Sequence, residues 1–233
     1  MATGGDLRWV QVEQDDRGVA TVSMNKPPVN ALGSEMVGDL TAAAAALAED
    51  PDVRCVVLRS AGRHFCAGAD LKERQGMTVE QVRGFVPRLA GAVNSFAALP
   101  VPVIAAVRGA AAGGGCELAL GCDLRVLSED ATIGLRETAL AIIPGAGGTQ
   151  RLPRIVGAAT AKRWIFTAGM FDAAEAWADG VADQVVPTDK LDLAADDLAG
   201  SIAANGPVAI RLAKQAIEQG AGLPLKEALA LEW

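Results

Sequence analysis

The sequence lacks several features that define large classes of proteins. It contains one histidine, His64, which by itself cannot supply a serine–histidine pair or a multi-histidine metal site, and which we expect in a loop. It also has no excess of basic residues, because 21 lysines and arginines stand against 28 aspartates and glutamates, for a net charge of −7. A nucleic-acid-binding face requires clustered positive charge, so this balance argues against a nucleic-acid partner.

Long apolar segments are also missing. The apolar run at residues 42–47 is bounded by Thr41, Glu49 and Asp50. It is therefore well short of the roughly 20 residues that a membrane-spanning helix needs. The first residues, Met1–Asp6, contain no basic segment followed by an apolar one, so we expect no signal peptide. The sequence thus predicts no membrane partner and a cytoplasmic location.

Cysteines are few and are not paired in sequence. Cys55, Cys66, Cys116 and Cys122 form no C-x-x-C pair and stand among apolar residues. This arrangement favours buried free thiols over disulfides or metal ligands, and we expect no metal site. Free thiols are typical of a reducing compartment, which again favours the cytoplasm.

The composition that is present is typical of a globular protein. Hydrophobic residues make up 51% of the chain and charged residues 21%, which excludes a disordered chain. At 233 residues, the chain is long enough to bury a sizeable core. We find no fixed-period repeat and no linker that would separate two independent domains.

Short apolar strands alternate with helical segments along the chain. Strands are predicted at residues 9–12, 19–24, 54–58, 123–128, 132–135 and 181–186, and in the apolar run that begins at residue 103. Helices are predicted at residues 35–49, 78–98, 149 onward, 173–179 and 224–233, just after residue 70, and as a pair between residues 189 and 219. This alternation predicts an α/β fold with a parallel sheet. We expect an α/β core over residues 1–186 and a helical region over residues 187–233.

Two polar residues are predicted to begin helices. Ser34 precedes an alanine-rich segment and fits the N-cap position. Asp70, with Glu73 three residues later, fits a capping box. Gly68 and Ala69 would then lie at a helix N-terminus, where free N–H groups can bind negative charge.

The stretch Val103–Glu117 joins an apolar run to three glycines and a carboxylate. The glycines allow the backbone to come close to a ligand, and a helix starting there would carry Glu117 in its first turn. Taken alone, the pattern fits tight packing as well as a binding site. Two such helix starts could together form an oxyanion hole, with Glu117 and Glu137 as acid and base. By spacing alone, Glu137 beside Arg136 fits a solvated loop better.

Four segments in order resemble the crotonase superfamily, and their spacing is similar to that of an enoyl-CoA hydratase. They are Phe65–Leu71, Gly109–Ala119, Gly121–Asp123 and Ile143–Leu152. The resemblance runs from about Trp9 to the end of the chain. It implies a ClpP/crotonase-like α/β fold, in which strand–helix units form a spiral and the C-terminal part is helical.

The resemblance also implies roles for individual residues. The N–H groups of Ala69 and Gly114 would form the oxyanion hole, and Glu117 and Glu137 would hold the water that adds to a 2-enoyl-CoA. Glu137 is favoured as the donor of the proton to C2. Coenzyme A (CoA) is expected along two segments through contacts with Lys26, Pro28, Val29, Ala31, Ala67, Gly68, Asp70 and Leu71. CoA belongs to the substrate, so no separate cofactor is expected.

The activity implied is the hydration of 2-enoyl-CoA to 3-hydroxyacyl-CoA, in fatty-acid or branched-acid degradation. An isomerase, which can work with one carboxylate, is one alternative. The segments 65–74 and 140–144 also look like the methylglutaconyl-CoA hydratase branch, whose acid-bearing acyl group would require a basic residue. Arg83 and Arg88 are candidates, although a solvated helix face explains them more simply. A binding or scaffold protein with a decayed site is the non-enzyme alternative, against which the intact glutamates weigh.

The resemblance further implies assembly into a homotrimer or a hexamer formed by two trimers. Family members usually continue beyond the point that matches Trp233, and the chain stops inside a helix-forming stretch. We therefore expect the C-terminal helical region to be incomplete.

Overall fold

A computed structural model describes residues 7–232, so the prediction about the first six residues lies outside the described range. Its main sheet has six strands in the order β1-β2-β3-β4-β6-β9. The first two strands are antiparallel and the remaining neighbours are parallel, as the strand–helix alternation predicts. The bounds are β1 Val10–Gln14, β2 Val19–Met24, β3 Cys55–Ser60, β4 Val103–Val107, β6 Leu124–Ser128 and β9 Gln184–Val186.

A second, three-stranded sheet lies beside the glycine-rich turn. Its strands are β5 (Ala110–Ala112), β7 (Thr132–Gly134) and β8 (Phe171–Asp172), with β7 in the middle. Neither β5 nor β8 is predicted from the sequence, because strands of two or three residues are too short for a period to be recognised.

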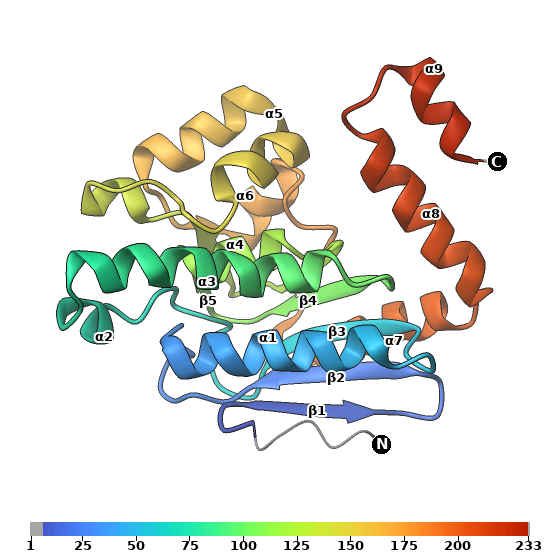
Figure 1. Cartoon of the computed structure of the whole chain (residues 1–233), viewed down its shortest axis with the longest axis horizontal. Coiled ribbons are helices and arrows are strands. Elements are labelled where there is room, and N and C mark those ends of the chain that lie inside the picture. Colours follow the sequence, from blue (N-terminus) through green and yellow to red (C-terminus); the bar gives the residue numbers. More distant parts are fainter. Residues whose placement is uncertain (1–6, 233) are drawn as a thin grey trace.

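Helices cover both faces of the main sheet. Figure 1 shows α1 (Ser34–Glu49) and α3 (Val79–Ala97) lying side by side across one face. On the other face, α7 (Leu191–Ala203) packs its small and apolar residues on β3, β4 and β6. The remaining helices are α2 Leu71–Gln75, α4 Gly114–Leu120, α5 Gly148–Thr167, α6 Ala173–Ala178, α8 Pro207–Gly220 and α9 Leu225–Ala228.

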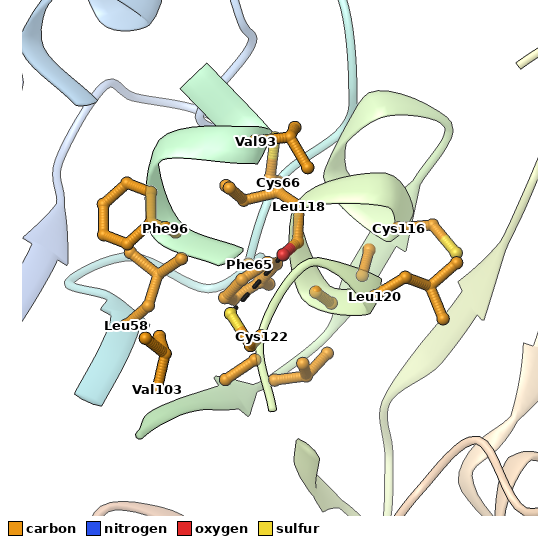
Figure 2. Close-up of a cluster of buried hydrophobic side chains, with 14 of the residues drawn as sticks. Leu58, Phe65, Cys66, Val93, Phe96, Val103, Cys116, Leu118, Leu120 and Cys122 are labelled. Atoms are coloured by element: carbon orange, nitrogen blue, oxygen red, sulfur yellow. Dashed lines mark hydrogen bonds between the residues drawn. The ribbon is translucent and has the colours of Figure 1, made fainter. Parts of the chain in front are cut away.

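The strand β4 is buried on both faces, as its continuous apolar run predicts. Val103 and Ala105 face the core beneath α1 and α3, whereas Ile104 and Ala106 face the core beneath α7. The strand leads through β5 into α4, so its burial fixes the position of the glycine-rich turn. Figure 2 shows the apolar cluster under this turn, in which Phe65, Leu118 and Phe96 come from three different segments. All four cysteines are buried free thiols, as expected.

Of the two predicted helix caps, Ser34 is wrong, whereas Asp70 caps its helix without the reciprocal Glu73 contact of a capping box. The N-cap of α1 is Gly33, and Ser34 is its first helical residue. Asp70 does cap α2 by accepting from the N–H groups of Lys72 and Glu73. The Glu73 carboxylate, however, accepts from the Ser34 N–H at 3.0 Å and from its hydroxyl at 2.5 Å, instead of reaching back to Asp70. A side chain from α2 thus caps α1, and no local pattern can predict such a tertiary contact.

The C-terminal helices α8 and α9 extend away from the body of the molecule (Figure 1). No residue of α8 is buried, and its apolar Val208, Leu212 and Ile217 are exposed. Lys214 connects this helix to the core by donating to the Asp123 carboxylate at 2.8 Å and to the Val101 carbonyl at 3.1 Å. Polar contacts from Lys214 therefore join α8 to the core. Among residues 7–232, no helix is both long and apolar enough to cross a membrane.

Candidate active site

The two predicted oxyanion donors lie close together. A Cβ placed on Gly68 would be 3.2 Å from the Gly114 nitrogen, and one placed on Gly114 would be 3.7 Å from the Ala69 nitrogen. Backbone hydrogen bonds hold the two segments in this position, because Cys66 N–H donates to Ala110 at 3.0 Å and Ala112 N–H donates to Cys66 at 2.9 Å. The structure thus brings both predicted donors to one place.

Each of the three consecutive glycines meets a different neighbour. Gly113 has a φ of +53°, and a Cβ there would be 2.9 Å from Oε1 of Glu137. A Cβ on Gly115 would overlap the carbonyl oxygen of Cys66. At Gly114, by contrast, a Cβ would have only ordinary to tight contacts, and it would lie beside the Ala69 nitrogen. The turn therefore requires glycine for packing at two positions, while the third borders the other predicted oxyanion donor.

Glu117 lies in the first turn of α4, as predicted, and is only 2% exposed. Its Oε1 accepts from the N–H groups of Ala146 at 2.7 Å and Gly148 at 2.9 Å. Burial raises the pKa of Glu117, while these two N–H groups and the charge of Arg151 oppose the rise. A carboxylate with two donors on one oxygen keeps its second oxygen available to bind water.

Glu137 follows β7 and begins a short 3-10 turn, Glu137–Leu140. The expectation from spacing alone, a solvated loop residue, is wrong: its carboxylate lies over Gly113, and its Oε2 is buried without a hydrogen-bond partner among residues 7–232. Burial raises the pKa of Glu137 to about 7, and the nearby charge of Glu117 adds to this rise. The two predicted carboxylates thus lie near each other, and the charge of Glu117 favours the protonated form of Glu137.

Sequence reasoning missed the groups that hold Glu117. Ala146 and Gly148 lie in the glycine loop that leads into α5, and Arg151 lies in the first turn of that helix. The guanidinium of Arg151 donates to the Ala146 carbonyl at 3.0 Å and to Oδ1 of Asn94 at 2.6 Å. These residues belong to a motif that carried the family resemblance, but their spacing gives no indication that they support Glu117.

The two segments predicted to bind CoA lie side by side. Ala67 N–H donates to the Val29 carbonyl at 2.9 Å, and Leu32 N–H donates to the Gly68 carbonyl at 2.8 Å. Lys26 joins the segments through its Nζ, which is 3.0 Å from Oδ2 of Asp70. This ion pair is about four-fifths buried on each side.

The other predicted CoA contacts lie along the same pair of segments. Pro28, Ala67 and Leu71 are exposed, and Val29 and Ala31 are half-buried. The edge beside Ala69 therefore offers both apolar surface and backbone groups to a long ligand.

Arg83 and Arg88, the candidates for binding an acid-bearing acyl group, are both exposed on α3. Arg88 borders a cavity of about 660 Å³ between α1, α2 and α3, with Ser34, Glu73 and Met77 on its other sides. A second cavity, of about 580 Å³, lies at the β1–β2 turn and contains none of the predicted site residues. Within residues 7–232, no three histidine, cysteine, aspartate or glutamate side chains are placed to hold a metal ion.

The fold and the site together place two backbone N–H groups and two carboxylates in one region, an arrangement suited to acid–base catalysis beside a stabilised anion. Comparison with known families agrees with this chemistry. A family model described as enoyl-CoA hydratase/isomerase matches residues 14–233, so the chain belongs to the enoyl-CoA hydratase/isomerase family. It is a crotonase-superfamily enzyme, a hydratase or an isomerase, and this family acts on CoA thioester substrates.

Individual relatives support the assignment. The chain is 44% identical over 238 residues to the mitochondrial methylglutaconyl-CoA hydratase of Homo sapiens, covering 100% of this chain and 70% of the relative. Among solved structures, it is similar to an enoyl-CoA hydratase from Bacillus anthracis, with a TM-score of 0.94, 44% identity and coverage of 96% of this chain and 87% of the other. It is also similar to Pseudomonas aeruginosa DspI, with a TM-score of 0.94, 33% identity and coverage of 100% and 96%. The predicted crotonase fold is confirmed.

Proposed function

We propose that the protein hydrates 2-enoyl-CoA thioesters to 3-hydroxyacyl-CoA. The observation that carries this proposal is a buried and a half-buried carboxylate, Glu117 and Glu137, beside two neighbouring N–H groups. Hydration needs a group that positions and deprotonates a nucleophilic water and a group that protonates C2. Glu117 and Glu137 supply one of each, whereas moving a double bond requires only one proton-transfer group.

The thioester oxygen binds between the N–H groups of Ala69 and Gly114. As water adds to C3, negative charge moves onto this oxygen and an enolate forms, which the two donors stabilise. Loss of one such donor typically lowers the rate by about 10²–10³-fold. The pocket walls near Gly114 are Leu32 and Leu89, and their apolar side chains keep water away from the enolate.

The environments of the two glutamates favour different roles. Glu117 accepts two backbone hydrogen bonds and lies near Arg151, both of which favour its ionised form, so it removes the proton of the attacking water. Glu137 has a raised pKa of about 7, so near neutral pH it carries a proton in a large share of molecules and delivers it to C2. The oxygen of water then bonds to C3. One of its two protons passes to Glu117 and the other stays on the new hydroxyl, while the proton added at C2 comes from Glu137.

The CoA moiety lies along residues 26–31 and 67–71, with Lys26, Pro28, Val29, Ala31, Ala67, Gly68, Asp70 and Leu71 in contact with it. The exposed apolar face of α8 supports assembly into a trimer or a hexamer, in which a second copy would cover it.

A branched, acid-bearing substrate such as methylglutaconyl-CoA is the second candidate. The relatives with that name, at 44% and 45% identity, are the observation that favours it. In that case, a basic residue must meet the acyl carboxylate, and Arg88 is the arginine of α3 that borders a cavity.

The test is an assay of purified protein on a short 2-enoyl-CoA, on its 3-enoyl isomer and on methylglutaconyl-CoA. We expect loss of the conjugated-enoyl absorbance and a product heavier by one water, and both should disappear in E117Q and E137Q. If the protein converts the 3-enoyl isomer but adds no water to the 2-enoyl substrate, it is an isomerase instead. Preference for methylglutaconyl-CoA in kcat/KM would establish the second candidate.

A further inference from the structure

We propose that Arg151, held in place by Asn94, is a positioning residue for Glu117: it fixes the turn that binds the Glu117 carboxylate and supplies the positive charge that keeps this carboxylate ionised. This inference rests on the proposed role of Glu117 as the base. It adds two residues, from α5 and α3, that touch neither the substrate nor the reacting atoms.

A continuous series of hydrogen bonds joins the two residues to Glu117. Asn94 on α3 accepts from Nη2 of Arg151 at 2.6 Å, and Nη1 of Arg151 donates to the Ala146 carbonyl at 3.0 Å. The N–H group of Ala146 donates in turn to Oε1 of Glu117 at 2.7 Å. Arg151 thus holds the same residue whose N–H group orients the carboxylate.

The turn is shaped to let the guanidinium approach. Gly147 lies between the two donor residues and has a φ of +113°, which side chains other than glycine rarely adopt. A Cβ at Gly147 would overlap Nη1 of Arg151. The Arg151 backbone N–H also donates to the Gly147 carbonyl at 2.8 Å. The guanidinium therefore lies directly against the turn and is part of its structure.

The same guanidinium has an electrostatic role. The titratable and charged groups that interact with Glu117 are Glu137, Arg151 and the thiol of Cys116. Of this set, Arg151 alone is a cation, and its half-buried position weakens screening by water. Burial raises the pKa of Glu117 and Arg151 opposes this, so removing Arg151 will raise that pKa further.

The experiment compares R151Q, R151K and N94A with the wild type, with R154Q as the matched control. Arg154 lies one turn further along α5 and is exposed, and among residues 7–232 its side chain hydrogen-bonds only to Gln150. For R151Q, we expect the acid limb of the kcat/KM profile to move up by about one pH unit, and the rate below that limb to fall about tenfold or more. R151K should restore the position of the limb, because it keeps the charge, but not the full kcat. N94A should give a smaller shift, and R154Q none.

A purely structural role for Arg151 would lower the thermal midpoint and the rate equally at all pH values, with no shift of the acid limb. Circular dichroism melts of the four variants identify that outcome. If R151Q loses its fold, R151K and N94A still test the inference through the same profile.

A titration independent of turnover separates this inference from the proposed reaction. The ionisation of Glu117 can be followed by infrared difference spectroscopy of the resting enzyme, with its band assigned by its loss in E117Q. We expect the Glu117 band to titrate at higher pH in R151Q than in the wild type. Equal titration in the two proteins overturns the inference, even if the wild type hydrates enoyl-CoA. A shifted titration with no hydration by the wild type supports the inference and refutes the proposed reaction.

Discussion

Replacing Glu137 with glutamine should make the folded protein more stable while it abolishes hydration. In the folded state, the Glu137 carboxylate is largely buried, lies near Glu117, and has a buried Oε2 that accepts no hydrogen bond from residues 7–232. Each of these features disfavours the charged form. Glutamine keeps the shape of the side chain and removes the charge.

The size of the effect follows from proton linkage. The pKa of Glu137 rises from 4.5 to about 7 on folding, so the folded protein binds this proton more tightly. The free energy of unfolding therefore falls as the pH rises from about 4.5 to about 7, and the penalty is complete only above that range. At 1.36 kcal/mol per pH unit, the upper limit is about 3.4 kcal/mol. Because Glu137 is partly exposed, solvent screening reduces the expected gain for E137Q at pH 8 to about 1–2 kcal/mol.

Urea unfolding at fixed protein concentration, at pH 8 and at pH 4.5, measures this gain. The free energy of unfolding of E137Q should exceed that of the wild type at pH 8. The two values should be close at pH 4.5, where Glu137 is protonated in the folded state. Glu13, exposed on β1, gives the matched control: E13Q should change the free energy of unfolding by less than about 0.5 kcal/mol at both values. Equal stability of E137Q and the wild type at pH 8 would mean that the Glu137 charge carries no penalty in the fold, and the acid role assigned to it would lose its basis.

Three further predictions follow from the site and its supports. G114A should fold normally but lose about 10²–10³-fold in kcat, because its Cβ would be 3.7 Å from the Ala69 nitrogen; full activity would contradict the oxyanion assignment. K26M removes the largely buried cation that pairs with the Asp70 carboxylate. Initial rates measured over a range of substrate concentrations should show KM for the CoA ester raised by about tenfold, while kcat stays within about a factor of two. K214M breaks the ion pair to Asp123, so limited proteolysis should cut the α8 region faster than in the wild type, while the melting of the core changes little; equal cleavage rates would show that the pair does not hold the helix.

Local sequence patterns predicted most of the elements but not the contacts between them. The buried strand β4 and the helix break at Gly206 and Pro207 were recognisable, because an apolar run and a proline act within a few residues of their own position. Glu73, by contrast, caps α1 from α2, and sequence spacing has no information about a partner 39 residues away.

The same limit applies to the site. The prediction that Ala69 and Gly114 lie together depended on the family resemblance, because their neighbourhood is created by pairing between distant segments. Spacing alone gave the wrong environment for Glu137, since an adjacent arginine is exposed while the carboxylate turns inward over Gly113. Burial of a polar group is a property of the packed fold, and a single sequence reveals it only where the pattern is already known.

The three consecutive glycines restrict how such an enzyme can evolve. Gly113 lies under the Glu137 carboxylate, Gly115 packs on Cys66, and Gly114 borders the pocket, so a side chain at any of them impairs either the fold or the chemistry. Substitutions that change the preferred acyl group are therefore expected outside the reaction centre, at its periphery. The loop with exposed Leu140 and Ile143 can accept substitutions without disturbing this turn. The turn that carries the proposed reaction centre therefore has less freedom to vary than the exposed loop with Leu140 and Ile143.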